Sequence, residues 1–127
     1  MARGLEKHQE YVDALNLLGK TLARRARSRC ELSGESGTLK AFDLIGEPTE
    51  PSLDHVLLVC PAVREHLEGR NLDDRGSLRY LDEAVWSTER AVRMAAVRIL
   101  EQIDAPWAQE ALENARSMDA YEQVDEG

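Results

Sequence analysis

The chain has little of three things that would point directly to a function: aromatic side chains, cysteines and long apolar runs. Only 5% of its 127 residues are aromatic, so leucine, valine and alanine must fill the core, and a ligand cage of aromatic rings is not expected. Two cysteines are too few for the disulfide framework of a small secreted domain. No apolar stretch approaches the roughly 20 residues that cross a bilayer, and the first residues contain no apolar signal segment. We therefore expect a cytoplasmic protein with no membrane contact.

Sequence motifs that carry catalysis are also missing. There is no G-x-S-x-G, no H-E-x-x-H and no glycine-rich phosphate loop. The three histidines, His8, His55 and His66, are scattered along the chain. The sequence therefore predicts no catalytic residue, and we expect that the protein is not an enzyme.

Charge is present in quantity but is unevenly distributed. The net charge is −8, while residues 1–30 carry seven Lys or Arg against three acids, and residues 101–127 carry eight acids and one arginine. The net acidity disfavours general nucleic-acid binding, although the basic run RRARSR keeps that reading as an alternative. Unlike charges at the two ends can attract each other within one chain or between two copies. The candidate contact residues for nucleic acid or a protein partner are Arg24, Arg25, Arg27 and Arg29.

The apolar pattern of the first half predicts one long helix followed by a small β element. Leucines at helical spacing predict a helix over residues 1–28. The segments TLKAFDLI (38–45) and HVLLVC (55–60) predict the two strands of a hairpin. Proline suits the first turn of a helix, so Pro61 predicts a short helix that completes the region 29–69.

The second half predicts helices only, which makes the whole chain a mostly helical α+β domain. Helical spacing recurs through residues 78–118. Ser87 is the expected N-cap of the central helix, and Trp86 and Trp107 are expected to be core anchors. The acidic residues 119–127 are expected to form a flexible tail.

Four segments, taken together, resemble the PhnA-like family of small bacterial proteins with an N-terminal zinc ribbon. They are MARGLEKHQEYVDALNLLGKTLARRARSRCELSGE, VLLVCPAVREHLE, LRYLDEAVWSTERAVRMAAVRIL and WAQEALENA, and they cover the chain from Met1 to about Ala115. The tryptophan segment is the most specific of them. The resemblance implies a zinc-ribbon-like hairpin wrapped by helices. The family takes its name from a phosphonate-utilisation operon, but that label establishes no phosphonate-cleaving activity.

The chain departs from this family where the metal would bind. Members carry C-x-x-C twice, whereas the second positions here are Ser33 and Val63. Only Cys30 and Cys60 correspond to metal ligands, and a structural zinc site requires four. His55 lies five residues before Cys60, roughly 16 Å along an extended strand, and His66 is expected to point away from the site. We therefore expect no cofactor, with zinc as an alternative, for instance shared between two copies.

Two other readings of the cysteines remain open. Cys60 directly precedes a predicted helix start, where the helix dipole favours a thiolate, and Cys30 would be its partner in a redox pair. The plainer reading is two packed thiols left from a lost metal site, with Val63 extending the apolar contact. We therefore expect a non-catalytic accessory or protein-interaction module that self-associates or binds a larger protein. The alternatives are a thiol-redox or metal-dependent protein and a nucleic-acid-binding regulator.

Overall fold

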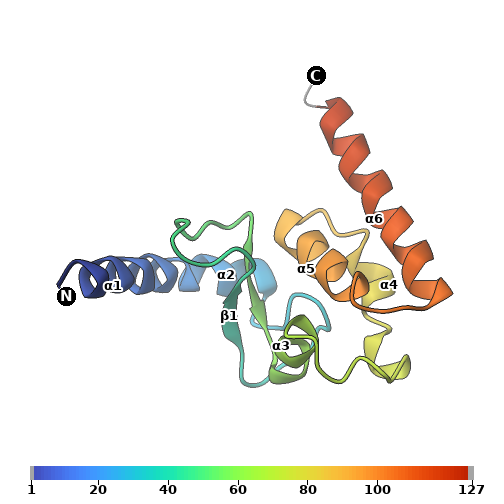
Figure 1. Cartoon of the computed structure of the whole chain (residues 1–127), viewed down its shortest axis with the longest axis horizontal. Helices are drawn as coiled ribbons and strands as arrows, with labels where there is room; N and C mark the ends of the chain where they lie inside the picture. Colours follow the sequence, from blue (N-terminus) through green and yellow to red (C-terminus); the bar gives the residue numbers. More distant parts are fainter. Residues whose placement is uncertain (1, 126–127) are drawn as a thin grey trace.

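The computed structural model describes residues 2–125 and has the expected mostly helical α+β fold (Figure 1). A single antiparallel hairpin lies between an N-terminal pair of helices and a C-terminal group of helices. Among residues 2–125, none of the helices combines the length and apolar character needed to cross a bilayer. In chain order the elements are α1 (Ala2–Leu17), α2 (Gly19–Ala26), β1 (Lys40–Asp43), β2 (Val56–Val59), α3 (Pro61–Leu67), the 3₁₀ turn η1 (Gly76–Leu78), α4 (Leu81–Ala84), α5 (Arg90–Leu100) and α6 (Pro106–Asp125).

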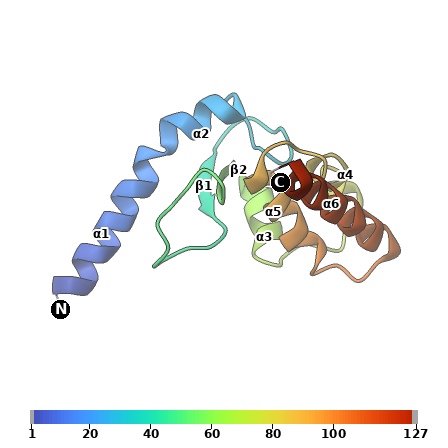
Figure 2. The same ribbon diagram turned by 90° about the horizontal axis from the view of Figure 1, so that it is seen from above.

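The N-terminal helix is divided, which the sequence did not predict. The break falls at Leu18, directly before Gly19, the residue in this region with the lowest helix propensity. The two helices together form a bent arm, in which α2 contacts β2 and the first turns of α1 lie farthest from the C-terminal helices (Figure 2). The second helix ends at Arg27, and both Arg27 and Ser28 have positive φ, 55° and 57°. These two left-handed residues turn the chain back toward the hairpin.

The hairpin confirms the predicted strand pair. Its strands pair antiparallel with Lys40 opposite Val59 and Asp43 opposite Val56. Strand β2 is almost fully buried, as its unbroken apolar sequence predicts. Proline at the first position of α3 begins that helix immediately after Cys60.

The C-terminal helices differ from prediction in their boundaries. The helix expected from Leu78 is replaced by η1 and the four-residue α4. Ser87 is not the N-cap of α5: its Oγ accepts the N–H of Glu89 at 3.0 Å, and the helix begins only at Arg90. Trp86 is not a core anchor either, because half of its surface is exposed.

Helix α6 is the largest departure. It does not end near Met118 but continues as a helix to Asp125, so the expected tail at 119–127 is helical as far as the structure describes it. Its first half packs in the core, through small residues that let it approach α5 closely, and its far end projects from the body (Figure 1). The packed residues are Ala108, Ala111, Leu112 and Ala115.

One buried cation holds α6 against α5 beyond that contact. Arg93 is 1% exposed, donates from Nε to Asp119 Oδ1 at 3.1 Å and from Nη1 to the carbonyl of Ser87 at 2.7 Å. A buried charge needs such partners. The pairing therefore fixes the direction in which α6 leaves the body.

Candidate functional site

The two segments that correspond to the C-x-x-C motifs of the family, Cys30 to Ser33 and Cys60 to Val63, lie side by side, as the resemblance implies. We call them the knuckles. The turn after Cys30 is closed by its N–H donating to the carbonyl of Glu35 at 2.8 Å and by Gly34 N–H donating to its carbonyl at 2.9 Å. The next residue, Glu31, donates its N–H to the carbonyl of Leu58 at 2.9 Å, and its side chain accepts the N–H of Leu58 at 2.8 Å. Glu31 therefore acts like a short third strand beside β2, which places Cys30 close to Cys60.

Of the four positions that would hold a metal in the family, only two carry a thiol here. Ser33 Oγ lies 3.6 Å from Cys60 Sγ, so two of the positions meet across the knuckles. Val63, the position of a third ligand, is 1% exposed and packs in the core with both cysteines. Within residues 2–125 there is no group of three or more His, Cys, Asp and Glu side chains that could hold a metal ion. Two thiolates alone leave a tetrahedral zinc two ligands short.

Sequence reasoning missed two residues beside these thiols, Tyr80 and His66. His66 lines the same hollow of about 700 Å³ as Ser33, Cys60 and Tyr80, but among residues 2–125 it forms no metal-binding group with the two cysteines. Its Nδ1 lies 2.6 Å from the hydroxyl of Tyr80, and the two rings stack with centroids 5.8 Å apart. Burial lowers the pKa of His66, against a smaller opposing effect of Glu65. No spacing signal links the two residues, because fourteen positions and an irregular connector separate them.

The ionisation of Tyr80 is influenced by both cysteines. Burial, with a smaller contribution from the nearby Cys30 and Cys60, raises the pKa of Tyr80. Both thiols are themselves buried, at 3% and 6% exposure. Reactive cysteines are usually partly accessible, so this environment suits packed thiols better than a nucleophile.

Arg25, one of the four predicted contact residues, is a structural clamp. It forms a two-pronged pair with Glu31, with N–O distances of 2.6 and 2.9 Å, and also donates to the carbonyls of Leu53 and Val56. The side chain of Glu31 is only 4% exposed. The hydrogen bond to Glu31 outweighs burial and raises the pKa of Arg25. Arg25 therefore joins α2 to the hairpin, and it also lines the open hollow described next.

The other three arginines are exposed. Across residues 2–125, none of the ion pairs or side-chain hydrogen bonds involves Arg24, Arg27 or Arg29. Arg27 and Arg29 line an open hollow of about 600 Å³, which we call the arginine hollow. Its other walls include Glu31, Ser87, Glu89 and Val92. Glu89 lies 3.8 Å from Arg25. Both acidic residues of the hollow, Glu31 and Glu89, therefore pair with Arg25 and leave the charges of Arg27 and Arg29 uncompensated.

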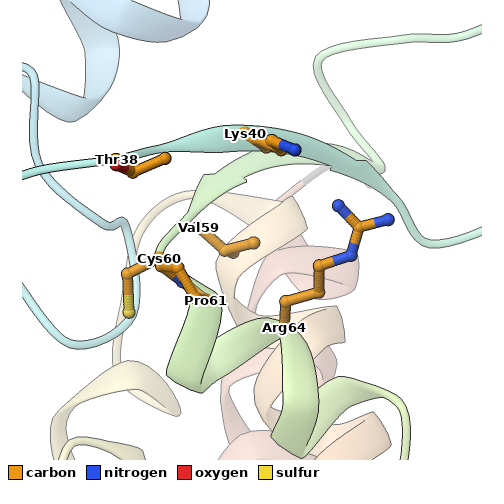
Figure 3. Close-up of a pocket in the computed structure, with 6 residues that line it drawn as sticks. All are labelled: Thr38, Lys40, Val59, Cys60, Pro61 and Arg64. Carbon is orange, nitrogen blue, oxygen red and sulfur yellow. The ribbon is translucent and has the colours of Figure 1, made fainter.

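A smaller hollow of about 160 Å³ lies on the other side of Cys60, between β1 and α3 (Figure 3). The charged ends of Lys40 and Arg64 lie on the same side of it, while the sulfur of Cys60 points away from them (Figure 3). Arg64 has an acid within 4 Å on its own helix, Glu68 at 3.9 Å. This hollow therefore offers positive charge but no thiol.

The junction between α1 and the hairpin holds a cluster of polar side chains. Tyr11 donates its hydroxyl to Asp43 Oδ2 at 2.7 Å, and His55 Nε2 lies 3.7 Å from Asp43 Oδ1. Burial alone would raise the pKa of Asp43, but the N–H groups of Gly46 and Ile45 and the hydroxyl of Tyr11 lower it below its usual range. His55 thus lies in this cluster and not with the cysteines, as the strand spacing predicts.

No protein-family model, curated protein or solved structure matches this chain. The PhnA-like resemblance therefore rests on the sequence segments alone and stays a prediction. Function must be argued from the geometry of the molecule itself.

Proposed function

We propose that this chain is a non-catalytic protein-interaction module built on a metal-free, zinc-ribbon-like core. Its knuckle positions serve packing: Val63 and both thiols are buried together, and Ser33 closes on Cys60. Its surface carries the residue types that dominate protein interfaces, exposed arginines and an exposed tryptophan.

The observation that carries the proposal is the surplus of exposed cations on a strongly acidic chain. With a net charge of −8, the acids of this protein are numerous enough to compensate every arginine. Arg24, Arg27 and Arg29 nonetheless have no acid partner among the described residues. Uncompensated positive charge at an exposed surface favours a partner that supplies the acids.

Native mass spectrometry and sedimentation velocity of the untagged protein test this proposal. We expect a mass of one bare chain or a multiple of it, and a sedimentation coefficient that rises between about 1 and about 100 μM, the range of weak specific contacts. A protein that stays monomeric throughout, and that recovers no partner from extracts of its own cells at stoichiometric yield, would contradict it.

The thiol-redox alternative draws on a specific observation, the placement of Cys30 and Cys60 in one cluster beside Tyr80. The same mass spectra separate the two proposals. A mass raised by one zinc per chain or per pair of chains would favour a metal site, and a loss of two hydrogens per chain after mild oxidation would favour an internal disulfide. An unchanged mass, with thiols that react with alkylating reagents only after unfolding, supports packed cysteines.

A further inference from the structure

The arginine hollow has the composition of a docking site for an acidic segment. Arg27 and Arg29 are exposed and uncompensated, and Ser87 and Val92 supply polar and apolar wall on the facing side. Trp86, half exposed, directly precedes Ser87. Arginine and tryptophan are the side chains that most often dominate binding energy at interfaces.

The chain itself contains a segment that matches this hollow. Residues 119–126, DAYEQVDE, carry four acids and no Lys or Arg; Asp119 is paired with Arg93 of its own chain, which leaves Glu122, Asp125 and Glu126 for a partner. Through Asp125 the backbone of the segment belongs to α6, so this part of it needs little ordering on binding.

The segment does not reach the arginine hollow of its own chain. Helix α6 packs against α5, and Figure 1 shows its far end well away from the end of α2. The tie between Arg93 and Asp119 holds α6 in that direction. The attraction between the two ends of the chain is therefore available only between copies.

We propose that residues 119–126 of one copy bind in the arginine hollow of a second copy. This inference rests on the proposed function and deepens it by naming the partner and both contacting surfaces. The two surfaces are different, so the contact is heterologous. It gives a closed dimer only where two copies bind each other reciprocally. Net repulsion between acidic copies opposes the contact, and local charge complementarity must overcome it.

A charge exchange between two variants tests the contact. The first variant, Arg27→Glu/Arg29→Glu, makes the hollow acidic; the second, Glu122→Arg/Glu126→Arg, makes the segment basic. Alone, each variant brings like charges together, and we expect its self-association constant to fall by about tenfold or more. When the two variants are mixed in equal amounts, the acidic hollow of one can bind the basic segment of the other. We expect complexes that contain both chains to form with an association constant at least as high as that of the wild type.

Matched controls separate this contact from a general charge effect. Lys40→Glu/Arg64→Glu changes the net charge as the first variant does, and Glu110→Arg/Glu113→Arg changes it as the second does, both at exposed positions outside the contact. We expect smaller changes in association for the controls, and unchanged thermal unfolding and circular dichroism for all four proteins.

The outcomes distinguish the two proposals. A wild type that is monomeric at every concentration contradicts the proposed function. A wild type that associates, but whose mixed variants do not recover association, overturns the docking of residues 119–126 and leaves self-association through another surface. Wild-type binding to a short DNA duplex that the first variant loses, with self-association unchanged, would assign the hollow to nucleic acid and likewise overturn it.

Discussion

At the scale of single residues, neighbouring arginines have opposite roles. Arg25 is held in a two-pronged ion pair with the buried Glu31, while Arg24 is exposed. Replacing one partner of a buried pair leaves the other charge uncompensated, so we expect Arg25→Met to lower the free energy of unfolding by about 3 kcal/mol. Arg24→Met is the control and should change it by less than about 0.5 kcal/mol. Urea unfolding measures both, and equal effects would contradict the clamp.

The knuckle positions give a second prediction at this scale. If the ribbon geometry of the resemblance is correct, the variant Ser33→Cys/Val63→Cys brings four thiols together with Cys30 and Cys60. We expect it to bind one zinc per chain and to unfold at a higher temperature with zinc than without. Elemental analysis and native mass spectrometry measure the zinc. Val63→Cys alone, with three thiols, is the control and should bind zinc more weakly. A double variant that takes up no zinc would remove the ribbon interpretation.

At the scale of elements, two side-chain contacts among the described residues join α1 to the hairpin region: the hydroxyl of Tyr11 donates to Asp43, and His8 Nδ1 lies 2.8 Å from Glu47 Oε1. Burial and the hydrogen bond to Asp43 raise the pKa of Tyr11 to about 12. An unfolded tyrosine ionises near 10, so the folded state holds this proton more tightly. The resulting stability is complete below pH about 10 and is lost as the pH rises through about 12.

Tyr11→Phe removes this dependence. Between pH about 10 and about 12 the free energy of unfolding of the wild type should fall relative to that of the variant. Urea unfolding at a series of pH values measures the difference. Because Tyr80 is common to both proteins, its own titration cancels. Parallel curves would mean that the hydroxyl of Tyr11 does not fasten α1.

The sequence predicted an element correctly where the residues that determine it lie within that element. The apolar run of β2 and the proline after Cys60 are local, and the strand and helix start they predicted are present. The acidic composition of residues 119–127 misled, because the pair between Arg93 and Asp119 supports α6 from another helix. The partners of Arg25 and His66 were not predicted, because Glu31 and Tyr80 lie on irregular segments whose path no periodicity records.

At the scale of the whole molecule, net charge and local charge act in opposite directions. The chain is acidic, with a sequence pI near 4.9, so copies repel one another at neutral pH, while the arginine hollow attracts the acidic residues 119–126. Lowering the pH from about 7 to about 5 reduces the repulsion before most carboxylates lose their charge. Below pH about 4 the carboxylates of the segment become protonated and the local attraction is lost.

We therefore expect self-association to strengthen from pH about 7 to about 5 and to weaken again below about 4. Sedimentation velocity across this range measures it, with circular dichroism at each pH to confine the comparison to folded protein. Arg27→Glu/Arg29→Glu is the control: with no cation in the hollow, its association should stay weak across the whole range. Association that peaks near the pI in both proteins alike would mean that loss of net charge drives it, since such association depends on no particular pair of surfaces.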